Sequence, residues 1–360
     1  MAPTLTPQTV LDALKVVRDP DLHRDIVSLG FVKDVVISGP RVAFKIQLTT
    51  PACPVKDQMR EQARAAVAAL PGVADVDVEM TASVRTAVDP AAGRAPVPGV
   101  RNVIAVGAGK GGVGKTTVAV NLALALARCG SRVGILDGDI YGPNVPIMLG
   151  VQAQLGSEGD KIVPAEKFGV QVVSMGFLTD DDSAVIWRGP MLHSVIQQFF
   201  RDVRWNDLDY LIVDLPPGTG DVALSLSQTV PVAGAVVVTT PQAVSVADSR
   251  RAVRMYEKLN IPTLGIIENM SYFVCSGCGR ESDIFGKGGG ERFAEQAAVP
   301  FLGRIPIYEP IRVGGDTGTP IVVAEPESPA ARAFVAAAEQ AAAQVSIASY
   351  RKPIPLTPVL

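Results

Sequence analysis

The residues best suited to chemistry form a glycine-rich segment in which the pattern Gly-x4-Gly-Lys-Thr runs from Gly109 to Thr116. This is the P-loop pattern of nucleoside triphosphate sites. Glycines let the backbone direct several N–H groups at one phosphate chain, and Lys115 supplies a compact positive charge for the β- and γ-phosphates. The Thr116 hydroxyl is a suitable Mg²⁺ ligand. We expect the following residues to bind the nucleotide: Gly109, Lys110, Gly111, Gly112, Val113, Gly114, Lys115, Thr116 and Thr117.

The surrounding sequence predicts the strand and helix that a P-loop needs. Residues 103–106 form a short apolar run before the loop, and apolar residues follow it at helical spacing as far as Gly130, which is suited to end a helix. The segment also fits the dinucleotide fingerprint G-x-G-x-x-G, but that pattern leaves the Lys115-Thr116 pair unexplained. We therefore interpret the segment as a triphosphate site.

Carboxylates close two further apolar runs. Asp137 and Asp139 follow residues 133–136, and Asp214 follows residues 210–213. Ligands of parallel α/β sheets bind at the carboxyl ends of the strands, so these side chains are expected to face the phosphates. Asp139 is the candidate for orienting or deprotonating the attacking water. Asp214 has the position of a Walker B aspartate, which holds Mg²⁺ through its water shell.

The segment after Asp214, residues 215–221, combines two prolines with two glycines. Rigid and mobile residues together are typical of a switch loop. We expect the backbone N–H of Gly218 to read the γ-phosphate.

A pair of cysteines, Cys275 and Cys278, has metal-knuckle spacing with a glycine between them and another after them. Two thiolates are only half of a four-ligand site. The chain contains no second C-x-x-C, and both histidines, His23 and His193, are remote in sequence. Two copies of the chain would supply four cysteines across a two-fold axis. Zinc and a [4Fe–4S] cluster both accept such a set, and the residue chemistry leaves the two open.

Strand and helix patterns alternate along most of the chain, which predicts a doubly wound parallel α/β sheet preceded by a smaller α/β domain. We place the small domain at 1–83, a Pro/Gly-rich linker at 84–99, the P-loop ATPase domain with the cysteine pair at 100–346 and a loose tail at 347–360. In the small domain we expect helices over 6–18 and 55–70 and strands over 32–37, 42–48 and 73–80. In the ATPase domain we expect further strands over 170–174, 235–239 and 264–268, and helices over 190–201, 221–229, 245–259 and 327–345.

Composition and charge restrict the cellular compartment and the kinds of partner that we expect for this protein. The net charge of −3 gives no indication of a general nucleic-acid binder. No apolar run approaches the roughly 20 residues of a membrane span, and the sequence shows no secretion signal. Four cysteines in 360 residues do not form a disulfide framework. We therefore expect a cytoplasmic protein that binds neither nucleic acid nor membrane.

A second lysine, Lys110, makes the loop resemble the deviant Walker motif K-G-G-x-G-K-[ST] of the dimeric ATPases that include MinD, ParA and the nitrogenase iron protein. The resemblance implies a homodimer in which Lys110 reaches the partner's nucleotide. Residues 137–144 and 214–221 resemble the Mrp/ApbC group of ATPases more closely. That likeness implies ATP hydrolysis, an adenine contact by Asn269, late nucleotide-pocket loops at 303–306 and 312–320, and a [4Fe–4S] cluster on Cys275 and Cys278.

The first domain resembles the small SufT-like domain through Val17–Asp21, Asp25–Gly30 and Thr49–Pro54. The resemblance covers most of residues 8–80 and implies a role in iron–sulfur cluster assembly. Cys53 lies at a strand-to-helix junction, where a helix N-terminus lowers a thiol pKa. A metal-binding thiolate and a small buried side chain both remain open for this residue.

Together with the residue patterns, these resemblances imply a homodimeric, Mg²⁺-dependent ATPase that receives a [4Fe–4S] cluster from a donor and transfers it to apo-proteins. A positioning ATPase of the MinD or ParA kind is one alternative, but it requires a basic membrane-binding helix or a basic DNA-binding surface. A metal-binding scaffold that does not hydrolyse nucleotide is another. An electron-transfer ATPase like the nitrogenase iron protein fits less well, because that family draws its ligands from separated cysteines.

Overall fold

The computed structural model describes residues 5–87, 94–139, 142–152, 155–177, 189–218, 221–275 and 277–350, without the side chains of 189–193 and 221. The described residues fall into two compact units. One contains 5–85 and Tyr350, and the other contains 86–349.

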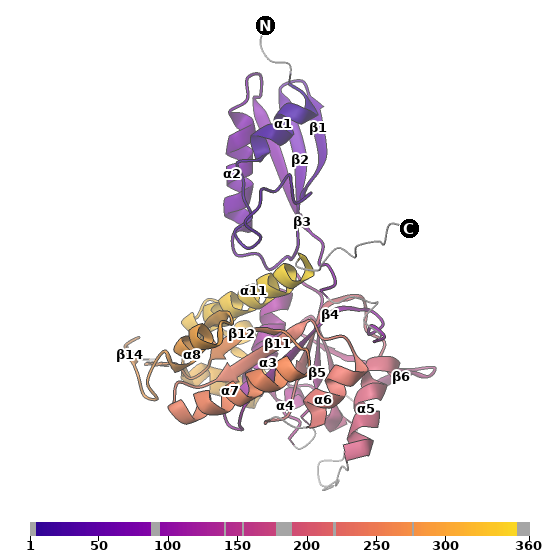
Figure 1. Cartoon of the computed structure of the whole chain (residues 1–360), viewed down its shortest axis with the longest axis vertical. Helices are drawn as coiled ribbons and strands as arrows, with labels where there is room; N and C mark the ends of the chain where they lie inside the picture. Colours follow the sequence, from indigo (N-terminus) through magenta and orange to yellow (C-terminus); the bar gives the residue numbers. More distant parts are fainter. Residues whose placement is uncertain are drawn as a thin grey trace. The chain divides into compact units, whose positions relative to one another are not determined.

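The smaller unit is a three-stranded sheet with two helices, and Figure 1 shows these elements. Strand β2 (Arg41–Leu48) lies in the middle, antiparallel to β1 (Val32–Ser38) and parallel to β3 (Asp75–Ala82). Helices α1 (Pro7–Leu14) and α2 (Lys56–Ala68) contribute Leu14 and Met59 to a core shared with Phe44. All five elements were expected from the apolar periodicity.

Helix α1 begins where the sequence predicts and ends four residues early. The Thr6 hydroxyl accepts the Thr9 backbone N–H at 3.2 Å, which caps the helix. The chain turns after Leu14, and Arg18 pairs with Asp25 in an isolated antiparallel bridge. Pro20 disfavours helical backbone at Asp19 and clashes with a carbonyl four residues earlier, so it limits how far a helix can extend, and α1 ends before that limit.

The larger unit contains an eight-stranded sheet in the order β15-β12-β11-β4-β10-β5-β9-β8. Neighbouring strands are parallel, except that the short edge strand β8 runs antiparallel to β9. The expected doubly wound sheet is therefore confirmed, with one antiparallel edge added. The strands are β4 (Val100–Ala108), β5 (Val133–Asp137), β8 (Ala165–Lys167), β9 (Val170–Ser174), β10 (Leu208–Asp214), β11 (Gly234–Thr239), β12 (Thr263–Glu268) and β15 (Phe301–Arg304).

The sheet is covered on both faces. Every residue of β5, β10 and β11 is buried, which requires a layer on either side. Side chains of α5, α6, α7 and α8 share one apolar core with the strands, while α3 packs on β4, β5 and β10. The helices are α3 (Lys115–Arg128), α4 (Val145–Leu149), α5 (Gly189–Asp202), α6 (Asp221–Thr229), α7 (Ala243–Lys258), α8 (Gly289–Ala297), α9 (Glu309–Thr317), α10 (Ile321–Ala324) and α11 (Pro329–Tyr350).

Two short antiparallel pairs complete the unit. Strand β6 (Gly156–Glu158) pairs with β7 (Lys161–Val163), and β13 (Phe273–Val274) pairs with β14 (Glu281–Ser282). In Figure 1 the segment around β14 projects from the edge of the unit beside α8. Across the described residues, no helix combines the length and apolar character needed to cross a membrane.

One expected loop is a helix. Helix α9 occupies 309–317 and so includes residues 312–317 of the segment 312–320, where the family resemblance implies a nucleotide-pocket loop. A Cβ at Gly314 would overlap the Thr319 carbonyl, and one at Gly315 would crowd the Met148 methyl of α4. The two glycines therefore serve close packing here and do not break the helix.

Candidate functional site

The glycine-rich loop joins β4 to α3, as expected for a P-loop. Gly112 and Gly114 both have φ of 78°, a conformation that favours glycine. Gly109 lies against the backbone of α7, where a Cβ would overlap Asp248. The segment 109–117 also includes the first residues of α3, a 14-residue helix. The positive end of the helix dipole at this N-terminus favours bound phosphate.

Two predicted carboxylates meet beside this loop. Strands β5 and β10 are neighbours, and their final residues, Asp137 and Asp214, are paired in register. Both side chains are fully buried. Strand β4, which leads into the P-loop, lies on the other side of β10. The sheet order therefore brings the P-loop and both carboxylates to one edge.

Lys115 and Thr116 contact Asp214 directly. The Lys115 ammonium lies 2.7 Å from Asp214 Oδ1, and the Thr116 hydroxyl donates to Asp214 Oδ2 at 2.7 Å. Asp139 completes the cluster, with Oδ2 3.7 Å from Lys115 Nζ. Burial raises the pKa of Asp214, and Lys115 opposes that rise. Without nucleotide, Lys115 is therefore the cation paired with Asp214, and Asp139 lies at a longer distance from the same ammonium.

Asp137 accepts hydrogen bonds from the segment that follows β5 and from the end of β9. Its carboxylate accepts the backbone N–H groups of Asp139 at 3.2 Å and Val145 at 3.1 Å, and the Ser174 hydroxyl at 3.0 Å. Burial and the neighbouring Asp214 charge raise the pKa of Asp137 to about 7. The carboxyl groups of Asp137, Asp139 and Asp214 therefore gather at this edge of the sheet beside the Lys115 ammonium, and such a cluster of oxygen ligands suits a divalent cation.

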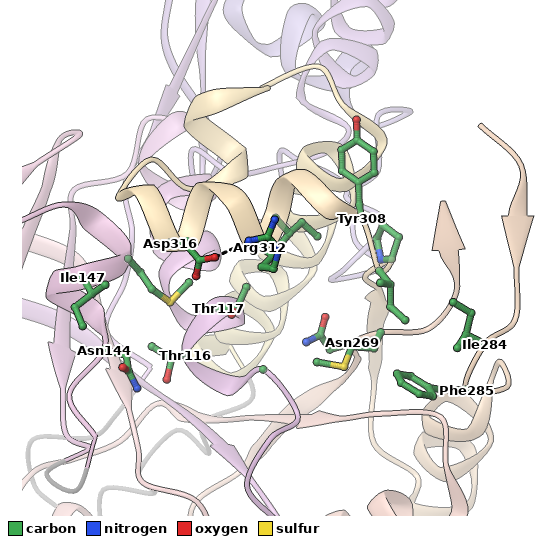
Figure 2. Close-up of a pocket in the computed structure, with 17 residues that line it drawn as sticks. Thr116, Thr117, Asn144, Ile147, Asn269, Ile284, Phe285, Tyr308, Arg312 and Asp316 are labelled. Carbon is green, nitrogen blue, oxygen red and sulfur yellow. Dashed lines mark hydrogen bonds and ion pairs between the residues drawn. The ribbon is translucent and has the colours of Figure 1, made fainter. Parts of the chain in front are cut away.

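A cavity of about 650 Å³ opens beside the P-loop. Figure 2 shows Thr116 and Thr117 at its centre, Ile147 and Asn144 on one side and Asn269 on the other. Most of its walls are apolar, as in many small-molecule sites. The lining residues are Gly114, Thr116, Thr117, Asn144, Ile147, Met148, Asn269, Met270, Ile284, Phe285, Pro306, Ile307, Tyr308, Ile311, Arg312, Gly315 and Asp316.

Asn269, the candidate adenine residue, is tied to the P-loop. Its side-chain amide donates to the Val113 carbonyl at 2.8 Å. The close approach requires Gly114, because a Cβ there would overlap the Asn269 amide. The structure therefore places this side chain in the cavity wall and fixes its orientation.

Lys110 and Gly218, two other predicted nucleotide contacts, differ from Asn269 in their hydrogen bonds. Lys110 is half-buried, and no hydrogen bond or ion pair joins its side chain to the part of the chain that the structure describes. The Gly218 N–H donates to the Ala108 carbonyl at 3.2 Å, so reading a phosphate would require this bond to open. Ile140, Tyr141, Thr219 and Gly220 of the two expected switch segments lie outside the described residues.

The cysteine pair lies in the turn between β13 and β14. Cys275 is half-buried and Cys278 is exposed, and the Gly279 N–H donates to the Cys275 carbonyl at 2.8 Å. Backbone N–H groups of Cys278 and Gly277 lower the pKa of the Cys275 thiol, which favours the metal-binding thiolate. Among the described side chains, no group of three or more Cys, His, Asp or Glu residues is placed to hold a metal ion.

Cys53 belongs to the smaller unit. It is buried, 8% exposed, in the core beside the start of α2. Burial favours the packing interpretation of this residue over that of a metal-binding thiolate. His193 is within α5, and its side chain lies outside the described residues.

The sequence analysis missed several residues that line the cavity. Ile147 and Met148 come from α4, and Tyr308 precedes α9, two helices that no strong periodic signal marks. Ile284 and Phe285 carried a readable signal, since they are an apolar pair within the polar, glycine-rich stretch 279–290.

Two family models match the chain. The model described as NUBPL iron-transfer P-loop NTPase, in the ParA group, matches residues 99–342. The model described as iron-sulfur cluster assembly protein matches residues 7–80.

Curated relatives match along almost the whole chain. The iron-sulfur cluster carrier protein of Synechocystis sp. is 50% identical over 354 residues, covering 96% of this chain and 99% of that protein. The protein of the same name from Deinococcus radiodurans is 52% identical over 340 residues, covering 94% and 95%.

Solved structures match about two thirds of the chain. A nucleotide-binding protein from Archaeoglobus fulgidus, in complex with ADP, has a TM-score of 0.57 and 36% identity, covering 64% of this chain and 91% of that one. The cell division ATPase MinD from Pyrococcus furiosus has a TM-score of 0.52 and 28% identity, covering 66% and 97%. The chain therefore belongs to the Mrp/ApbC family of iron–sulfur cluster carrier P-loop NTPases, with an N-terminal SufT-like domain.

Proposed function

We propose that this protein is a homodimeric ATPase that carries a [4Fe–4S] cluster between its two chains and delivers it to apo-proteins. One observation carries the proposal. A two-cysteine knuckle, with no third ligand among the described residues, projects from the same unit that holds a P-loop. Two thiolates from each of two chains supply the four that a cubane accepts.

The nucleotide site supports MgATP as the other substrate. Lys115 would move from Asp214 to the phosphates when ATP binds. Mg²⁺ would then be held by the Thr116 hydroxyl and, through its water shell, by Asp214. The 2.7 Å contact between these two side chains already brings both ligand groups together. The cation supplies charge stabilisation for the phosphates during hydrolysis.

Asp139 would position the attacking water. It lies two residues beyond the end of β5, is 13% exposed, and has a carboxylate oxygen 3.7 Å from the Lys115 ammonium that would contact the phosphates. Lys110 would cross to the partner's nucleotide, consistent with an ammonium that no described residue holds. Asn269 would contact the adenine edge with its free carbonyl, since its amide is bound to Val113.

The cluster is the cargo, received from a donor and passed to apo-proteins in a reducing cytoplasm. The first domain would contribute to this exchange, as its match to an assembly-protein family suggests. Binding and hydrolysis of ATP would change the dimer and thereby the affinity for the cluster.

Cluster transfer tests the proposal. The reconstituted protein is mixed anaerobically with an apo-ferredoxin whose four cysteines accept a [4Fe–4S] cluster, and transfer is followed by circular dichroism. We expect Cys275→Ala/Cys278→Ala to abolish transfer. Cys129→Ala, which changes another half-buried cysteine of the same unit, should transfer at the wild-type rate. Transfer that is indifferent to MgATP and to Lys115→Ala would contradict the coupling.

A further inference from the structure

One continuous segment leaves the nucleotide cavity, carries the cysteine pair and returns to the cavity. It begins at Asn269 and Met270, which line the cavity, and passes through Cys275 and Cys278. Only six residues beyond Cys278, Ile284 and Phe285 line the cavity again. We call residues 269–288 the cysteine hairpin.

A buried carboxylate ties both ends of the cysteine hairpin together. Glu268 is fully buried, and one of its oxygens accepts the Ser271 hydroxyl at 2.5 Å and the Gly288 N–H at 2.8 Å. The other oxygen accepts the Gly290 N–H at 2.5 Å. Because Glu268 precedes Asn269 directly, the anchor of the hairpin adjoins the residue that binds the P-loop carbonyl.

The body of the cysteine hairpin is also bound to the cavity wall. The Val274 N–H donates to the Ile307 carbonyl at 3.0 Å, and the Ile307 N–H donates to the Tyr272 carbonyl at 2.6 Å. Across the hairpin, the Cys275 N–H donates to the Arg280 carbonyl at 3.0 Å. The Lys287 ammonium lies 4.7 Å from the centre of the Tyr272 ring. These contacts connect the strand that leads into the cysteine turn to the cavity wall at Ile307 and to Lys287, two residues beyond Phe285.

Ile284 and Phe285 present apolar surface at the cavity. Their exposed fractions are 57% and 42%, which is high for large apolar side chains. Figure 2 shows both on the same side as Asn269, across the cavity from Ile147 and Asn144. An aromatic ring beside a hydrogen-bonding amide is suited to a flat heterocycle, because the ring stacks and the amide reads an edge.

We propose that Phe285, flanked by Ile284, packs against the nucleotide base, so that base binding and metal binding at Cys275 and Cys278 act on the same hairpin. The inference rests on the proposed nucleotide site and adds a specific base contact to it. It also predicts reciprocal coupling: loading the cysteines changes nucleotide affinity by the same factor by which nucleotide changes affinity for the cargo.

Two probes separate a base contact from a general disturbance of the site. ADP carries the base, whereas inorganic tripolyphosphate contains only the phosphate chain. In the full-length protein, we expect Phe285→Ala to weaken ADP binding at least about fivefold, since base–aromatic stacking is of that size. Tripolyphosphate binding should be unchanged. Phe168→Ala removes a comparably exposed phenylalanine, 37% exposed, from the turn between β8 and β9 outside the cavity lining and should alter neither ligand.

Each outcome of these titrations is decisive. Wild-type protein that binds ADP while Phe285→Ala and Ile284→Ala bind it equally well would overturn the inference and leave the proposed function intact. Equal weakening of ADP and tripolyphosphate would also overturn it, because Phe285 would then support the site as a whole. Wild-type protein that binds neither probe would instead overturn the proposed nucleotide site.

The coupling is measured by titrating ADP into protein with and without a reconstituted cluster. We expect the two wild-type dissociation constants to differ, and the ratio to approach one in Phe285→Ala. An equal ratio in both proteins, or a wild-type ratio of one, would overturn the coupling.

Discussion

The Lys115 ammonium and the Asp214 carboxylate form a buried ion pair, with Nζ and Oδ1 separated by 2.7 Å. Lysine is 7% exposed and aspartate is fully buried, so each charge depends on the other in the nucleotide-free protein. ATP would replace the carboxylate with phosphate as the partner of Lys115, and Mg²⁺ would replace Lys115 as the cation near Asp214. We therefore propose this pair as the element that nucleotide binding rearranges.

Lys115→Ala should destabilise the protein as well as abolish nucleotide binding. Removing one partner of a buried pair leaves the other charge uncompensated, at a cost of about 3–5 kcal/mol in the free energy of unfolding. Urea unfolding of the nucleotide-free protein measures this change. The double variant Lys115→Ala/Asp214→Asn should recover part of the loss. If Lys115→Ala is as stable as the wild type, the ion pair does not stabilise the apo state.

Asp139→Asn should slow ATP hydrolysis and leave nucleotide binding nearly intact. The amide keeps the size of the side chain but cannot accept a proton from water, and loss of such a group costs about 10²–10⁴ in rate. Steady-state ATPase assays, with ADP affinity as the control, test this role. Turnover at the wild-type rate would assign water positioning to another group. A wild-type protein without turnover would favour the non-hydrolysing scaffold.

The stability of the metal-free, nucleotide-free protein should fall as pH rises. The pKa of Asp137 is raised to about 7, so the folded state keeps a proton that the unfolded chain releases near pH 4. That contribution is complete below the unfolded pKa and is lost as pH rises toward and through 7. Urea unfolding between pH 5 and 8 measures this change. The free energy of unfolding should decline less steeply with pH in Asp137→Asn than in the wild type, whatever the absolute stability of the variant. Identical slopes would mean that Asp137 is already ionised when buried.

Glu268→Ala should loosen the cysteine hairpin at both ends. Three donors lose their acceptor: the Ser271 hydroxyl and the backbone N–H groups of Gly288 and Gly290. Leaving buried donors unsatisfied costs about 1–3 kcal/mol each. Hydrogen exchange should become faster at Gly288 and Gly290 and stay unchanged in β5. Unaltered exchange at those two amides would show that Glu268 does not hold the hairpin.

The sequence predicts those features of this molecule that depend on residues close together along the chain. The P-loop and the two strand-ending aspartates are local patterns, and the parallel topology brings Asp137 and Asp214 into register beside Lys115. The sequence does not predict partners brought together by the fold. The Ala108 carbonyl that accepts the Gly218 N–H and the Val113 carbonyl that accepts the Asn269 amide are examples. Helix α9 was missed because residues 312–320 were interpreted as a pocket loop from the family resemblance, whereas tertiary packing keeps Gly314 and Gly315 within a helix and requires their missing side chains.

Cargo stoichiometry tests the central claim most directly. Iron, sulfide and zinc are determined after anaerobic reconstitution, and native mass spectrometry counts chains per cluster in the same samples. The account predicts one cubane of four irons and four sulfides per two chains, and none in Cys275→Ala/Cys278→Ala. Zinc alone, a complete cluster on a single chain, or a cluster that survives the double variant would contradict it.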